Sequence, residues 1–122
     1  MRITDAELSV MDVLWVEPGL GAAEVASRIE GKSWSDKTVK TLLARLVGKG
    51  ALRADQEGRR YLYTPLVARD EHQKSAVGRL ADKLFGGRAA PLVAHLADAR
   101  DLTEDDILEL EELVRRLKDD RE

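Results

Sequence analysis

Positively charged and hydroxyl side chains recur along the stretch Trp34–Leu52, WSDKTVKTLLARLVGKGAL, between apolar residues spaced three and four apart. This spacing predicts a helix with one buried face and one polar face. Amines and guanidinium groups bind phosphate oxygens or guanine edges, hydroxyl groups donate or accept hydrogen bonds, and the small Ala44 permits close approach. The polar face is therefore predicted to contact DNA through Ser35, Lys37, Thr38, Lys40, Thr41 and Arg45.

Formal charge is distributed unevenly along the chain. The 122 residues sum to a net charge of -3, yet residues 32–60 hold eight basic and three acidic residues, a local excess of +5. From Val67 onward, ten basic residues stand against fourteen acidic ones, a local excess of -4. A net negative charge therefore does not argue against a nucleic-acid partner, because the positive charge is concentrated in one segment.

Groups for catalysis or metal binding are scarce. The two histidines, His72 and His95, fall in different predicted helical segments and lack a second ligand at metal-binding spacing. The sequence has no cysteine, no Gly-rich phosphate loop and no nucleophile elbow. It therefore predicts no enzyme, no metal site and no cofactor. Zero cysteines, and no long apolar run or export leader, favour a cytoplasmic protein without membrane insertion.

Three stretches carry the residue pattern of a helix N-terminus. Thr4 is followed three residues later by Glu7, which predicts a capping box, and Thr103 and Asp106 repeat that spacing. Ser35 precedes the basic helix as its N-cap. The predicted helices cover residues 5–16, 22–29, 36–49, 67–85, a short segment around 92–96, and 104 towards 121.

A β-hairpin is predicted after the basic helix. Residues 51–56 and 59–65 alternate around Glu57-Gly58, and Gly50 is a predicted left-handed helix end. Alternation this short is compatible with burial of either face of the hairpin. Arg59 and Arg60 beside the turn are predicted to reach the neighbouring DNA backbone or minor groove.

Three helices followed by a two-stranded hairpin form the winged helix-turn-helix arrangement. Its third helix, here about 21 Å long, fits the major groove, and its short second helix crosses the backbone. We therefore predict a mainly α fold with a small β-hairpin. A winged-helix DNA-binding domain would cover residues 1–66, and a C-terminal helical dimerisation arm would cover residues 67–122.

The segment after Pro65 carries apolar stripes but is too short to bury them in a core of its own. Uncovered stripes would form a large apolar patch, which a two-fold homodimer would bury. The alternative is that these helices fold back on the winged helix of the same chain. The predicted dimerisation residues are Val77, Leu80, Leu84, Phe85, Ile107, Leu110, Leu113, Val114 and Leu117.

Six segments together resemble the BlaI/MecI/CopY family of bacterial repressors of penicillinase and methicillin-resistance genes. The segments are AELSVMDVLW (6–15), WSDKTVKTLLARLVGKGAL (34–52), YLYTPLV (61–67), LFGG (84–87), PLVAHL (91–96) and LTEDDILELEELV (102–114). The resemblance implies a homodimeric repressor that binds a palindromic operator upstream of resistance and sensor genes. It places the DNA-reading helix on Lys37, Thr38, Lys40, Thr41 and Arg45, and the wing on Arg59 and Arg60.

The resemblance also implies a route of induction. In studied members a membrane sensor-protease detects β-lactam, and the repressor is cut within the dimerisation arm, commonly at an Asn-Phe bond. The aligned position here is His95-Leu96, which departs from that pair. The copper-responsive branch uses a C-terminal cysteine cluster, so the lack of cysteine excludes thiolate copper sensing. Two other functions remain open: a ligand-responsive MarR-like regulator, and a winged-helix module that binds an acidic protein partner.

Overall fold

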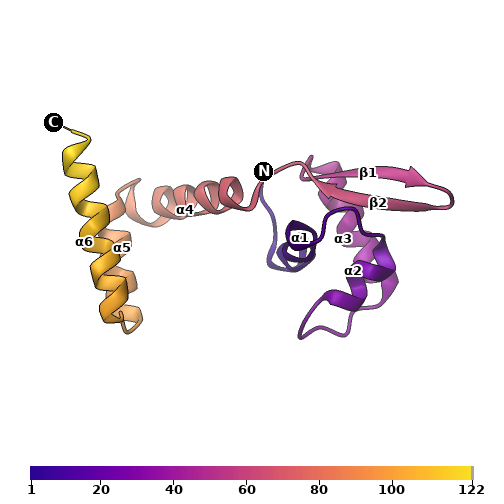
Figure 1. Cartoon of the computed structure of the whole chain (residues 1–122), viewed down its shortest axis with the longest axis horizontal. Coiled ribbons are helices and arrows are strands. Elements are labelled where there is room, and N and C mark those ends of the chain that lie inside the picture. Colours follow the sequence, from indigo (N-terminus) through magenta and orange to yellow (C-terminus); the bar gives the residue numbers. More distant parts are fainter. Residues whose placement is uncertain (122) are drawn as a thin grey trace. The chain divides into compact units, whose positions relative to one another are not determined.

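The computed structural model describes residues 1–121 and contains six helices and one two-stranded antiparallel sheet within that range (Figure 1). This confirms the predicted fold class. The chain divides into two compact units, residues 1–76 and the residues from 77 onward, with the division inside α4. The elements are α1 (Asp5–Val16), α2 (Ala22–Arg28), α3 (Asp36–Gly48), β1 (Leu52–Glu57), β2 (Arg60–Pro65), α4 (Arg69–Phe85), α5 (Ala89–Ala99) and α6 (Glu104–Asp119).

Side-chain caps fix the starts of three helices. In α1 the Thr4 hydroxyl accepts from the Glu7 N–H at 3.2 Å, while Glu7 Oε1 accepts from the Thr4 N–H at 2.8 Å. Thr103 forms the same reciprocal pair at the start of α6. Ser35 accepts from the N–H of Thr38 and so caps α3. Each cap satisfies backbone donors that have no partner inside the helix, and the three predicted starts are confirmed.

The first unit is built around the packing of α1, α2 and α3. Its buried core consists of Val10, Met11, Leu14, Leu20, Val25, Val39, Leu42, Leu43, Leu46, Ala51 and Leu52. Val47 belongs by its spacing to the apolar stripe of α3 but is 36% exposed. At about 100° per residue, Val47 lies roughly 80° around the helix from Val39, at the edge of the buried face. Val10 of α1 is fully buried.

The end of α3 turns the chain directly into the hairpin. Gly50 has φ +81°, and the N–H groups of Gly50 and Ala51 donate to the carbonyls of Val47 and Leu46. These two bonds form the Schellman arrangement, which closes the helix. The chain then enters β1 at the buried Leu52, so the base of the hairpin joins the core.

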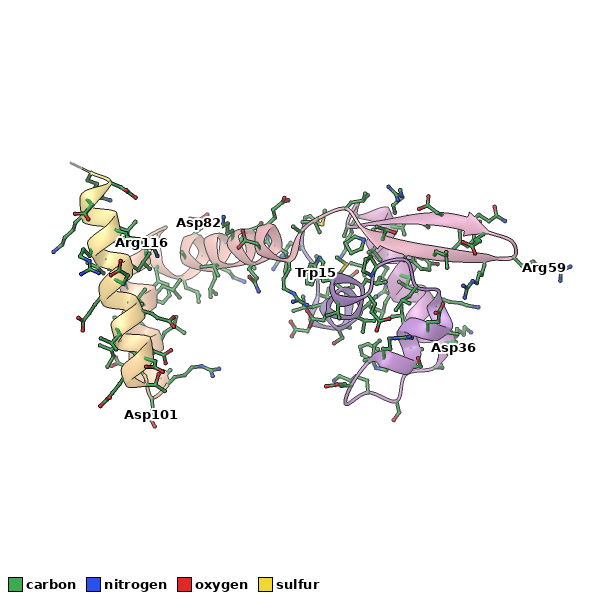
Figure 2. The ribbon with its side chains drawn as sticks, viewed as in Figure 1. Trp15, Asp36, Arg59, Asp82, Asp101 and Arg116 are labelled. Carbon is green, nitrogen blue, oxygen red and sulfur yellow. The ribbon has the colours of Figure 1, made fainter. Side chains whose placement is uncertain are left out.

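The far end of the hairpin is a two-residue loop. Glu57 pairs with Arg60 in the antiparallel register, which leaves Gly58 and Arg59 as the loop. Gly58 has φ +64°, as the first central residue of a type II′ hairpin loop requires. Arg59 therefore lies at the tip of the wing, where Figure 2 shows it away from the helices.

The second unit has no buried residue among residues 77–121. Its helices α5 and α6 lie side by side (Figure 1). Residues of both helices line a groove of about 740 Å³. Large apolar side chains on these helices remain exposed, including Leu96, Leu113 and Leu117. Within residues 1–121, none of the helices combines the length and the apolar character that crossing a membrane requires.

Candidate nucleic-acid interface

The exposed face of α3 is the polar complement of its buried face. Val39, Leu42, Leu43 and Leu46 point into the core and hold the helix in place. The residues between them are left at the surface, as their spacing predicts. These exposed residues are Lys37, Thr38, Lys40, Thr41, Ala44 and Arg45.

The hydroxyl groups of this face are already oriented by local hydrogen bonds. Ser35 Oγ and Thr38 Oγ1 lie 3.2 Å apart at the start of α3, where Figure 2 also shows Asp36. Thr41 Oγ1 donates to the carbonyl of Lys37 at 3.1 Å. A hydroxyl that donates one bond keeps its lone pairs as acceptors. The Thr41 hydroxyl can therefore still accept a bond from a DNA base edge.

Ion pairs engage some cations of the basic segment, residues 32–60, and leave others without an acidic partner. Three of its basic residues are paired with acids: Lys49 with Glu7, Arg53 with Asp55, and Arg60 with Glu24. Lys32 lies over the ring of Trp34, with 5.8 Å from its Nζ to the ring centroid. Within residues 1–121, no ion pair with an acidic side chain engages Lys37, Lys40, Arg45 or Arg59. Apart from Lys32, the positive charge without an acidic partner is therefore on α3 and at the tip of the wing.

Arg60 occupies a different setting from Arg59. Its Nη1 lies 2.9 Å from Glu24 Oε1, and the same oxygen accepts the N–H of Gly21 at 3.0 Å. The Gly21 N–H lowers the pKa of Glu24 below its usual value, and Arg60 adds to that effect. Arg60 was predicted as a DNA contact beside the hairpin turn. In the structure, Nη1 of this guanidinium contacts Glu24 of α2.

The contact of Arg60 with α2 borders a cleft of about 470 Å³ between α2, α3 and the wing. Tyr61 is half exposed and lines it, whereas Tyr63 is partly buried and packs against the core. Burial raises the pKa of the Tyr63 phenol. The other residues of the cleft are Gly21, Ala22, Ala23, Glu24, Lys40, Arg59 and Arg60.

Lys49 and Glu7 connect the end of α3 to the first turn of α1. Lys49 Nζ lies 2.5 Å from Glu7 Oε1 and also donates to the carbonyl of Arg2 at 2.8 Å. Burial by itself raises the pKa of Glu7, but hydrogen bonds from Lys49 and Thr4 outweigh it, so the pKa lies below its usual value. Lys49 thus serves the fold, although it belongs to the basic segment.

Glu24 was missed when the site was predicted from the sequence alone. Its local signal was present, because Glu24 lies three residues after Gly21, the spacing at which a Glu side chain accepts the backbone N–H of the N-cap residue. Its partner Arg60 is 36 residues away, and no local pattern indicates that pairing.

Residues 3–116 match the family model described as penicillinase repressor. The chain belongs to the penicillinase repressor family. It is 31% identical over 118 residues to the penicillinase repressor of Bacillus licheniformis, covering 96% of this chain and 92% of that protein. The resemblance to the BlaI/MecI family is thereby confirmed, and so are the predictions of a DNA-binding repressor and of a protein that is not an enzyme.

Two solved structures of relatives each match more than half of the chain. The DNA-binding domain of the repressor BlaI is 41% identical, with a TM-score of 0.52, covering 57% of this chain and 87% of that one. Monomeric BlaI of Bacillus licheniformis, solved with the blaP half-operator, is 40% identical with a TM-score of 0.50, covering 58% and 88%. The match supports the winged-helix architecture of the first unit.

Proposed function

We propose that this repressor acts in the cytoplasm as a homodimer that occupies a palindromic DNA operator and blocks transcription from the promoter. One observation carries the proposal. The cations of α3 are exposed and unpaired within residues 1–121, and 58% of the chain matches, at 40% identity, a relative solved with half of its operator. A site of this kind can place α3 in a major groove and the wing on the adjacent backbone.

The proposed contacts divide by chemistry. Lys37, Lys40 and Arg45 would bind phosphates or guanine edges, since an unpaired cation gains most from a phosphate oxygen. The hydroxyl groups and Arg59 would set the register of the helix on the duplex. The full proposed set is Ser35, Lys37, Thr38, Lys40, Thr41, Arg45, Arg59 and Arg60.

The apolar surface of residues 77–121 supports the homodimer. Leu80 is 44% exposed, Val114 49% and Leu117 53%, and the unit has no buried core in a single protomer. A second copy related by a two-fold axis would cover these side chains and present two copies of α3 to a palindrome. We keep residues 1–66 as the DNA-binding domain and 67–122 as the dimerisation arm. The proposed interface contains Val77, Leu80, Leu84, Phe85, Ile107, Leu110, Leu113, Val114 and Leu117.

Release of the operator would follow cleavage in the arm. His95 and Leu96 lie on α5 and are both exposed, and the ring of His95 is 5.1 Å from that of Phe85. A protease would have to open α5 locally, which an element without buried residues permits. A membrane sensor-protease is the proposed partner, and genes of the β-lactam-resistance or stress type are the proposed targets.

Titration of labelled duplexes with the full-length protein tests the proposed function. One duplex carries the sequence upstream of the protein's own gene, and the other is of random sequence and equal length. At two salt concentrations, we expect tighter binding to the upstream duplex and a steep loss of affinity with salt for both. Equal affinity for both duplexes would contradict operator recognition. Absence of binding to either duplex would favour the protein-interaction alternative.

A further inference from the structure

One carboxylate joins the wing to the helices that support it. Glu24 Oε1 accepts two hydrogen bonds, from the N–H of Gly21 at 3.0 Å and from Arg60 Nη1 at 2.9 Å. The first bond is local and fixes the carboxylate at the start of α2. The second spans 36 residues and reaches the first residue of β2. Glu24 therefore connects the start of α2 to the end of the hairpin that carries the turn.

A contact of this kind can stabilise the hairpin, because only the base of the hairpin is in the core. Leu52 at the start of β1 is 1% exposed, whereas every residue from Asp55 to Tyr61 is exposed. An isolated two-stranded hairpin is marginally stable in water. The bridge between Leu20 and Tyr63 holds the middle of β2. Beyond that bridge, the Arg60–Glu24 contact is the remaining tie to α2 among the hydrogen bonds and ion pairs of residues 1–121.

The Arg60–Glu24 contact lies close to two other cations of the proposed interface. The cleft beside Glu24 is lined by Lys40 of α3 and by Arg59 at the tip of the wing. Glu24 is the one acidic residue among its lining residues within 1–121. A wing that swings away from α2 would carry Arg59 away from Lys40. The two cations could then no longer bind the same stretch of duplex in a fixed register.

We propose that Glu24 is a positioning residue for operator binding, which acts through Arg60 to hold the wing beside α2 and α3. The inference rests on the proposed DNA-binding function. Arg60 Nη1 contacts Glu24, and a guanidinium has five N–H donors, so the remaining donors stay available for a phosphate. The alternative is that Glu24 competes with phosphate for Arg60. The two alternatives predict opposite changes in DNA affinity when the charge of Glu24 is removed.

The test compares Glu24→Gln, Arg60→Gln and the double variant for binding to the upstream duplex at low salt. Gln keeps an oxygen that accepts the Gly21 N–H, so the start of α2 is preserved while the charge is lost. We expect Glu24→Gln to weaken binding about two- to fivefold, the range of an exposed charge pair. Arg60→Gln should weaken it further, and Glu24→Gln should add nothing in that background. Arg60→Lys retains the charge and should restore the sensitivity to Glu24→Gln.

Three results would overturn the inference. Tighter binding by Glu24→Gln with a steeper salt dependence would show competition with phosphate. An equal effect of Glu24→Gln with Arg60 present or replaced would show a role independent of the wing. Unchanged binding by Glu24→Gln, while Lys40→Ala weakens it, would refute the inference and leave the proposed function standing. Unchanged binding by Lys40→Ala would instead contradict the proposed function. Thermal unfolding of each variant confirms that the fold is retained.

Discussion

At the scale of single residues, the pairing of charges decides what the basic segment can do. Eight cations between Lys32 and Arg60 look equivalent in the sequence, but the structure assigns Lys49, Arg53 and Arg60 to internal ion pairs. Helix caps were predictable because Thr4 and Glu7 are three residues apart. The Lys49–Glu7 pair was not, because its partners are 42 residues apart and meet only after α1 packs on α3.

Two free cations of α3 give the first prediction. Lys40→Ala and Arg45→Ala should each weaken binding to the upstream duplex by about 1–3 kcal/mol if they contact bases or desolvated phosphates. Their side chains are exposed and unpaired within residues 1–121, so no internal ion pair is lost. Fluorescence anisotropy measures the change. Lys83→Ala, an exposed lysine on α4, is the control and should bind as the unaltered protein does. An unchanged mobility shift for the double variant would refute the assignment.

The half-buried pair of Glu7 and Lys49 gives a prediction on stability. Glu7 is 1% exposed, and Lys49→Ala would leave its carboxylate without a charged partner. We expect the free energy of unfolding near neutral pH to fall by roughly 1–3 kcal/mol. Chemical denaturation measures it, with the exposed Lys118→Ala as the control. An unaltered denaturation midpoint in Lys49→Ala would contradict the role given to this pair.

The same pair predicts the pH dependence of stability. The pKa of Glu7 lies below its ordinary value of 4.5 in the folded chain. Its contribution is therefore fully present above about pH 4.5 and is lost as the pH falls through the lowered pKa. The difference in unfolding free energy between the unaltered protein and Lys49→Ala should shrink in that acidic range. A difference that stays constant from pH 7 to about pH 3 would contradict this linkage.

At the scale of the elements, helix boundaries could be predicted from the sequence where a capping residue or a turn residue marks them. Helix α1 was predicted over 5–16 and is observed as Asp5–Val16, because a capping box starts it and Glu17-Pro18-Gly19 follows. Helix α5 is longer than predicted, Ala89–Ala99 in place of 92–96. Pro91 does not break this helix, because it lies in the first turn, where a backbone N–H has no partner within the helix.

The start of α4 is tied to α1 by one indole. Trp15 Nε1 donates to the carbonyl of Val67 at 2.9 Å, and Arg69 lies over the same ring at 5.4 Å. Trp15→Phe keeps an aromatic ring but loses the hydrogen bond, so we expect a loss of about 1 kcal/mol in unfolding free energy. Amides in the first turns of α4 should also exchange with solvent faster. Trp34→Phe is the matched control, and equal exchange of these amides in both variants would contradict the role of Trp15.

At the scale of the whole molecule, the sequence predicted two parts of different character. The basic, core-forming part has a packed interior, and the acidic part has apolar stripes that no residue of 77–121 buries completely. Periodicity could predict those stripes because it depends only on spacing along a helix. Periodicity could not predict what covers the stripes. A homodimer and helices that fold back on the winged helix of the same chain require the same spacing of apolar residues.

A variant that cannot dimerise should also lose affinity for the operator. Leu110→Asp combined with Leu117→Asp places two charges on the apolar face of α6, where burial against a second copy would cost several kcal/mol per unpaired charge. Sedimentation velocity should show monomers, and circular dichroism should show helices retained. Leu66→Asp, on an exposed leucine outside this unit, is the control for added negative charge and should remain dimeric.

The same double variant should lose most of its affinity for the upstream duplex but much less of its affinity for a duplex with one half-site. A dimer binds its second half-site from an already tethered position, at a high effective concentration, whereas two monomers must each bind from solution. Removing the interface therefore abolishes that advantage without altering the contacts of either α3. Dimers that persist in the double variant would show that other residues form the interface. Monomers that keep the full operator affinity would show that repression does not need paired recognition helices.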